Sequence, residues 1–178
     1  MIERGQILDR DFFARPALKV ARDLLGKFLV RHVNGLRIAA MIGETEAYIG
    51  PHDKACHAFR GRTDRTDVMF GDPGNWYVYF IYGMHWMLNV VTDEVDYPAA
   101  VLFRAAGEWI GPGRLTRGMQ IDRALNGLSA SKQTGLWIED RGIALPRGHI
   151  KRTPRIGVKY AAEWAEKPYR FLLNGRSS

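Results

Sequence analysis

The sequence has one cysteine, Cys56, and no long apolar segment. A lone cysteine forms neither an internal disulfide nor a cysteine-rich zinc cage, and such usage is typical of reducing compartments. No stretch approaches the roughly 18 apolar residues that a membrane helix needs. The residues after Met1 include an acid and lead into no apolar run, so they lack the form of a secretory signal. We expect a cytoplasmic protein that has no membrane partner.

The composition is that of an ordinary globular domain. The chain has 178 residues, of which 46% are hydrophobic and 25% charged. A chain of this length buries about two-thirds of its unfolded surface, so it needs no metal or disulfide for stability. We find no repeat or linker and expect residues 1–178 to form one domain.

Acidic residues are outnumbered by basic ones. There are 26 Lys and Arg against 19 Asp and Glu, a net charge of +7. This balance favours an acidic partner such as nucleic acid. Basic residues in loops and helix starts suit contacts to phosphate oxygens. For any one of them, a solvated surface position is a sufficient explanation. These residues are Arg60, Arg62, Arg65, Arg114, Arg117, Arg123, Arg147, Lys151, Arg152 and Arg155.

Apolar periodicity predicts an α+β fold. Apolar positions on one helical face predict a helix over 16–25, and alternation predicts strands over 27–33 and 36–48 joined at Asn34-Gly35. Further strands are expected over 76–82, 85–92, 99–105, 136–139 and 169–173, and helical segments over 111–125 and 161–164. The segment 50–73 is expected to be a long functional loop. Together these predict a single compact domain with a curved, mainly antiparallel sheet, surrounding helices and a protruding hairpin.

Acidic and aromatic residues gather late on the strand over 36–48. A period of two places Ile42, Glu44, Glu46 and Tyr48 on one face. A carboxylate beside aromatic rings can act as a general base. The alternative is a solvated glutamate paired with an arginine, and spacing does not separate the two. Glu44 lies further back and suits structural hydrogen bonding.

The other polar candidates lie in the loop and on the next strands. His52, Cys56 and His57 have poor spacing for zinc, so we expect no metal and no cofactor. His57 instead suits a single hydrogen bond. Four tyrosines either pack in the core or form a stacking site whose hydroxyl groups reach water. They are Tyr48, Tyr77, Tyr79 and Tyr82. Tyr82, at the hairpin tip, either caps the turn or enters a duplex as a wedge.

Several segments match the motifs of one known family in order and spacing. They are 44–51, His57, Met69-Phe70, 77–84, Asn89, 102–105, Gly111-Pro112, 155–158 and 163–165. From about Pro16 onwards the chain resembles the 3-methyladenine (alkyladenine) DNA glycosylase family, the type of fold that lacks the helix-hairpin-helix motif.

The resemblance implies roles for individual residues. Glu46 matches the catalytic carboxylate, which deprotonates the water that attacks the sugar C1′. The residues that match binding positions are Tyr48, His57 and Tyr79 around the flipped base, Asn89 as a guard against guanine, Arg104 at the nucleotide backbone, Ile156 and Gly157 beside the catalytic water, and Tyr82 with Met84 in the space left in the duplex.

The resemblance implies a monofunctional glycosylase that starts base excision repair. Its partner would be double-stranded DNA with alkylated or deaminated purines, bound from the minor groove by a monomer. Two alternatives are a non-catalytic nucleic-acid-binding module and a metal-dependent nuclease that uses Glu44, Glu46, Asp53 and Asp67.

Overall fold

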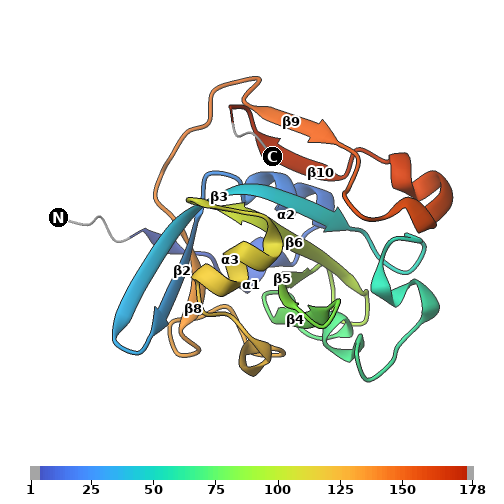
Figure 1. The fold of residues 1–178 in the computed structure, drawn as a ribbon, viewed down its shortest axis with the longest axis horizontal. Coiled ribbons are helices and arrows are strands. Elements are labelled where there is room, and N and C mark those ends of the chain that lie inside the picture. The colour runs from blue at the N-terminus through green and yellow to red at the C-terminus, as the bar shows by residue number, and fades with distance from the viewer. Residues whose placement is uncertain (1–4, 176–178) are drawn as a thin grey trace.

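A computed structural model describes residues 5–175 and shows an α+β fold built around one large sheet (Figure 1). The sheet has ten strands: β1 (Gln6–Ile7), β2 (Phe28–Val33), β3 (Leu36–Tyr48), β4 (Trp76–Ile81), β5 (His85–Thr92), β6 (Ala99–Ala106), β7 (Trp109–Ile110), β8 (Leu136–Asp140), β9 (Ile150–Thr153) and β10 (Arg170–Leu173). The strand order is β1-β8-β2-β3-β6-β5-β4, while β10 pairs with β3 and β9, and β7 pairs with β6. These pairings are antiparallel, which confirms the predicted fold class.

Short helices surround the sheet. The α-helices are α1 (Arg10–Phe13), α2 (Ala17–Asp23) and α3 (Pro112–Gly118), and the 3-10 helices are η1 (His57–Arg60), η2 (Asp67–Phe70), η3 (Arg123–Leu125) and η4 (Lys159–Glu166). The predicted helix over 16–25 corresponds to α2, which buries Ala17, Val20 and Ala21. Within the part of the chain described, no helix has the length and apolar character required to cross a membrane.

Two predicted helical segments are shorter or more broken than expected. The continuous segment over 111–125 is instead α3 followed by η3, because Gln120 between them has a positive φ of 51°. Ala162, also at φ 51°, interrupts η4. A residue in this left-handed region cannot continue a helix. Glutamine and alanine do not indicate a positive φ, so the sequence did not predict these breaks.

Strand β3 organises the sheet because its two halves pair with different strands. Residues 36–41 pair with β2, whereas Glu46 lies opposite Leu102 of β6 on one side and Arg170 of β10 on the other. In Figure 1, β9 and β10 lie along the end of β3 at one side of the molecule. Strands on both sides cover this half of β3, and residues 43–47 are buried.

The predicted alternation of β3 is interrupted. The register against β6 shifts between Ile42 and Glu44 and again between Glu44 and Thr45. Ile42 lies in the main core with Ala47, so it does not share a face with Glu44 and Glu46, as strict alternation predicted. A β-bulge of this kind re-aims side chains over one or two residues.

The predicted hairpin is formed by β4 and β5, and its tip carries Tyr82 and Gly83. Both residues have positive φ, 54° and 62°, and the N–H of Met84 donates to the carbonyl of Ile81. The main core packs Trp76 of β4 and Leu88 of β5 beneath this hairpin, together with Phe103 of β6. The core therefore fixes the base of the hairpin and leaves its tip exposed.

Candidate active site

A cavity of about 640 Å³ lies against β4, β5 and β6, which line it with alternate residues. Most of the predicted site residues line it: Tyr48, His57, Tyr79, Tyr82, Asn89, Arg104, Ile156 and Gly157. These residues come from positions between 48 and 157, so the sheet and its loops bring together groups that are far apart in the sequence. Glu46 lies behind this wall, bonded to Tyr48 and Ile156.

The Glu46 carboxylate is fully buried but well provided with donors. Its Oε2 accepts a 2.8 Å hydrogen bond from the Tyr48 hydroxyl, and its Oε1 accepts a 2.8 Å bond from the Ile156 N–H. Arg104 Nε lies 3.5 Å from Oε1. Burial raises the pKa of Glu46, while Arg104, the Ile156 N–H and Tyr48 partly oppose the rise. The result is a carboxylate that is more basic than usual and held in one orientation.

Glu44 is bound to two arginines. Its Oε1 accepts bonds from Arg104 Nε at 3.0 Å and from Arg170 Nε at 2.6 Å. This matches the structural hydrogen-bonding role expected of Glu44. Because Arg104 also approaches Glu46, Glu44 sets the position of a guanidinium shared by the two carboxylates.

Aromatic rings form one wall of the cavity. His57 Nδ1 lies 3.0 Å from the Tyr77 hydroxyl, and the His57 ring centroid is 4.6 Å from that of Tyr79. Burial, with a smaller effect of Arg65, lowers the pKa of His57 to about 4. The imidazole is therefore neutral at pH 7, and it makes the single hydrogen bond predicted. Burial also raises the pKa of Tyr77 to about 12, which keeps its hydroxyl protonated.

Asn89 is held on the cavity wall by a cross-strand bond. It lies opposite Tyr77, and its Nδ2 donates to the Tyr77 carbonyl at 3.1 Å. The side chain is 3% exposed, so its orientation is set by the sheet. The Asn89 amide therefore presents a fixed hydrogen-bonding edge to the cavity.

Tyr82 and Met84 project from the hairpin tip, and their side chains are 82% and 66% exposed. Tyr82 also lines the mouth of the cavity. A positive φ is uncommon for a large aromatic residue and is a form of backbone strain that gathers at functional sites. The hairpin tip therefore places an exposed, strained aromatic side chain at the mouth of the cavity.

The four carboxylates of the nuclease alternative are each paired with an arginine, and Glu44 and Glu46 share Arg104. Asp53 is paired with Arg155, Glu44 with Arg104 and Arg170, and Asp67 with Arg62. Within residues 5–175 no group of three or more His, Cys, Asp or Glu is placed to hold a metal ion. The geometry does not favour this alternative.

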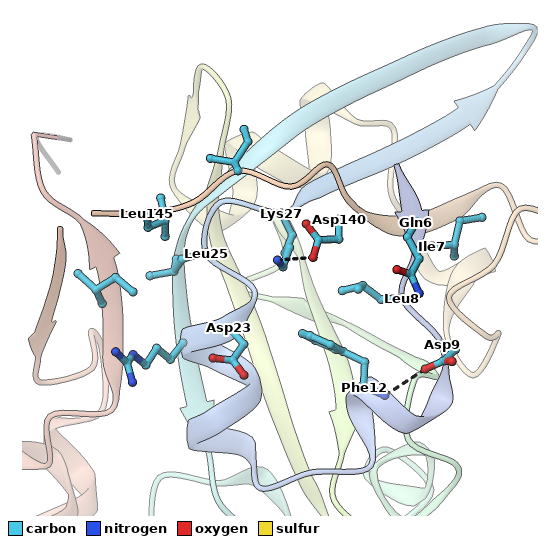
Figure 2. A pocket seen from close by; sticks show the side chains of 13 residues that line it. Gln6, Ile7, Leu8, Asp9, Phe12, Asp23, Leu25, Lys27, Asp140 and Leu145 are labelled. Atoms are coloured by element: carbon cyan, nitrogen blue, oxygen red, sulfur yellow. Dashed lines mark hydrogen bonds and ion pairs between the residues drawn. The ribbon is translucent and has the colours of Figure 1, made fainter. Parts of the chain in front are cut away.

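A second cavity, of about 630 Å³, lies away from these residues (Figure 2). Figure 2 shows Phe12 and Leu8 on one side and Leu25 and Leu145 on the other, with the ion pair of Lys27 and Asp140 between them. Lys27 Nζ lies 2.6 Å from Asp140 Oδ2. None of the predicted site residues lines this cavity.

Sequence reasoning missed several residues of the first cavity. Arg65 and Tyr160 line it, but Arg65 was predicted only as one of many basic residues in loops, and Tyr160 was given no role. Asp53 and Arg155 form a buried ion pair directly behind it. From the sequence alone, Arg155 was named only as a candidate phosphate contact and within the 155–158 motif, and Asp53 only as a nuclease carboxylate.

Known proteins resemble the chain over almost its whole length. The methylpurine-DNA glycosylase family matches residues 11–110 and 107–177. A protein from Methanocella arvoryzae is 51% identical over 185 residues, which cover 93% of this chain and 91% of the relative. A protein from Myxococcus xanthus is 48% identical, with 93% and 89% covered, and one from Legionella pneumophila (strain Lens) is 44% identical, with 93% of each covered. All three are provisionally named 3-methyladenine DNA glycosylase.

The matching family and these relatives show a DNA glycosylase, a DNA-repair hydrolase that cleaves N-glycosyl bonds. The chain belongs to the methylpurine-DNA glycosylase family, and its enzyme type is that of the 3-methyladenine DNA glycosylases. Membership of this enzyme family argues against the alternative of a non-catalytic nucleic-acid-binding module.

Proposed function

We propose that this enzyme flips an alkylated or deaminated purine out of duplex DNA and hydrolyses its N-glycosidic bond with Glu46 as the base. The observation that carries the proposal is the position of Glu46, buried with its donors directly behind an aromatic cavity. We assign residues 1–178 to one glycosylase domain. It acts as a monomer, in the cytoplasm with the chromosomal DNA, and needs no cofactor.

The cavity has the chemistry that a flipped purine requires. A base inside a duplex is out of reach, and extrusion costs a few kcal/mol, less for a damaged or mispaired base. The rings of Tyr48 and Tyr79 offer faces for stacking, and a cationic alkylpurine adds cation–π attraction of about 0.5 to 2 kcal/mol. Asn89, held at the wall, would test the edge of the base.

The hydrolytic step follows from the environment of Glu46. As the bond between C1′ and the base nitrogen breaks, the sugar gains oxocarbenium character, and the base leaves with the bonding electron pair. Glu46 takes a proton from water while the water oxygen bonds to C1′. A buried carboxylate with a raised pKa is a stronger base for this transfer. The Ile156 N–H and the Tyr48 hydroxyl keep it from rotating away.

The surroundings support a monofunctional enzyme. Strand cleavage through a Schiff base needs an amine nucleophile, and none of the residues from the described range that line the cavity is a lysine. Lys54, the nearest lysine in sequence to the motif, has its Nζ bonded to Glu163 at 2.8 and 3.1 Å. The expected products are the free base and an abasic site.

Tyr82 at the exposed tip would fill the space that the flipped nucleotide leaves, entering from the minor groove with Met84 beside it. Arg104 lines the cavity and is fixed by Glu44, so it can hold the backbone of the flipped nucleotide. A fixed guanidinium loses little freedom when it binds phosphate.

Glu46→Gln tests the proposal. The amide keeps the shape of the side chain but cannot take the proton, so we expect single-turnover base release to fall about 10² to 10⁴-fold. Binding of lesion duplex should change little. Duplexes carrying 3-methyladenine, 7-methylguanine, hypoxanthine or ethenoadenine would be scored for free base.

Glu139→Gln is the matched control, because Glu139 is also a buried strand glutamate but lies on β8 outside the cavity. This variant should release base at the wild-type rate at a temperature where it is folded. Undiminished release by Glu46→Gln would remove Glu46 from the mechanism.

A further inference from the structure

A buried ion pair lies directly behind the proposed catalytic carboxylate. Arg155 Nη1 and Nη2 donate to the two carboxylate oxygens of Asp53 at 2.6 and 2.9 Å. Both side chains are 0% exposed. Neither partner lines the cavity.

The pair joins three segments that meet at Glu46. Arg155 also donates to the carbonyl of Ala47 at 2.9 Å and to that of Trp164 at 3.3 Å. Asp53 accepts from the N–H of Ile49 at 3.2 Å and from that of Ala55 at 3.0 Å. The end of β3, the loop that follows it and the segment before η4 therefore share one set of bonds.

Both donors to Glu46 depend on this arrangement. The Ile156 N–H belongs to the residue directly after Arg155, and Tyr48 follows Ala47, whose carbonyl Arg155 binds. The Arg155 guanidinium also lies 4.8 Å from the centroid of the Tyr48 ring. A displacement of Arg155 would move the Ile156 amide and remove the support of the Tyr48 ring together.

Stability alone gives a weak reason for this pair. Taking two charges out of water costs much of what their attraction returns, and apolar residues of similar volume often serve equally well. Arg155 Nε is buried and has no hydrogen-bond partner within the described residues. The hydrogen bonds of Arg155 instead fix the segments that carry Ile156 and Tyr48, the two residues that donate to Glu46.

We propose that the Arg155–Asp53 ion pair is a positioning device for the glycosylase reaction, which holds the Ile156 N–H and Tyr48 on the Glu46 carboxylate. This inference rests on the proposed function. Arg155 and Asp53 are positioning residues, because they act through Ile156 and Tyr48 and touch no reacting atom.

The test is a double variant, Arg155→Met with Asp53→Asn, which leaves neither charge unpaired and keeps an amide oxygen at position 53. Misplacement of reacting groups by about 1 Å can cost 10²-fold in rate, so we expect single-turnover base release to fall about 10 to 100-fold. Binding of lesion duplex should stay within about three-fold, because Tyr79, Asn89 and Arg104 of the cavity wall do not contact the pair.

The pH profile separates positioning from a general loss of stability. The groups that act on Glu46 are Arg104 from β6, Arg155, the Tyr48 hydroxyl and the Ile156 N–H. In the double variant Arg155 is gone, and the Tyr48 hydroxyl and the Ile156 N–H no longer stabilise the charged carboxylate. The pKa of Glu46 should therefore rise, and the acidic limb of the pH–rate profile should move to higher pH. In the wild-type protein the Ile156 amide proton, followed by NMR, should titrate with that limb, and this coupling should weaken in the double variant.

Arg155→Lys and Arg141→Met complete the set. The lysine keeps the charge but loses the two-pronged contact, so its rate should lie between wild type and the double variant. Arg141→Met removes two bonds to the buried Glu139, away from the cavity, and should leave the acidic limb in place. If a folded double variant, or Arg155→Lys where the double variant does not fold, keeps both the wild-type rate and the wild-type limb, the inference is wrong. Failure of the wild-type enzyme to release base would instead overturn the proposed function.

Discussion

At the scale of single residues, two buried glutamates show how environment decides what a carboxylate does. Burial raises the pKa of Glu46, and its donors do not fully offset it. Burial acts in the same direction on Glu139, but bonds from Trp137 and Arg141 and the charge of Arg37 prevail and lower its pKa. The surroundings of Glu46 therefore disfavour its charged form at a cost in stability, whereas those of Glu139 favour its charged form.

This contrast predicts opposite effects of the same substitution on stability. The protonated form of Glu46 is favoured in the folded chain, so its contribution is complete below the ordinary pKa of 4.5 and is lost as pH rises through the raised value. Glu46→Gln should therefore have a higher melting temperature than wild type at pH 7 to 8, and the gain should vanish in acid.

Glu139→Gln should have a lower melting temperature than wild type at neutral pH. Its lowered pKa means that the stabilisation is present above 4.5 and is lost as pH falls through the folded value. Thermal denaturation of both variants from pH 4 to 8 measures the effects, and shifts of the same sign at pH 7.5 would contradict this account.

His57 gives a second pH prediction. Its pKa falls from an ordinary 6.5 to about 4, so between these values the unfolded chain binds a proton that the folded chain does not. Stability should fall as pH drops through this window. His57→Gln should remove part of that fall, whereas the exposed His149→Gln should leave it unchanged in denaturant unfolding at pH 5 and 8.

At the scale of elements, the β4–β5 hairpin joins a rigid base to a strained tip. Trp76 and Leu88 are fully buried at its base, and Tyr82 at the tip has a positive φ. Tyrosine is a poor choice for this conformation, whereas asparagine tolerates it. The proposed use of Tyr82 at the DNA surface would account for this strained tyrosine.

Tyr82→Asn uses that difference as a test. The variant should fold as stably as wild type, or more so, because Asn suits the left-handed turn. It should bind lesion duplex more weakly and flip less, which a fluorescent base reporter in the duplex would record. Tyr82→Phe keeps the ring and should flip nearly normally. Unchanged flipping by the Asn variant would remove the wedge role.

At the scale of the whole molecule, net charge should control affinity for DNA. The chain carries +7, and binding that neutralises phosphates weakens linearly in log–log plots against salt. Arg114 lines the first cavity and Arg22 the second. Arg114→Gln should reduce the slope by about one, while Arg22→Gln should leave it unaltered, as measured by fluorescence anisotropy from 50 to 300 mM salt. Equal slopes for wild type and both variants would place Arg114 away from the phosphates.

Much of the fold was predictable because its signals are local. The amphipathic face of α2, the Asn34-Gly35 turn and the alternating strands of the β4–β5 hairpin each lie within a few residues. The short elements β1, β7, β9 and α1 were missed because two to four residues carry no usable period. The bulge at Ile42 to Thr45 was missed because pairing with β6, not local sequence, produces it.

The site divides in the same way. Sequence alone determined the residue types, their order and the family resemblance, and with these the choice of Glu46 over Glu44. Tertiary structure decided what lies against Glu46: the Ile156 N–H, from more than a hundred positions away, and the buried pair of Arg155 and Asp53. The physical reason is that burial and charge pairing depend on distances in space, and only the folded sheet brings those segments together.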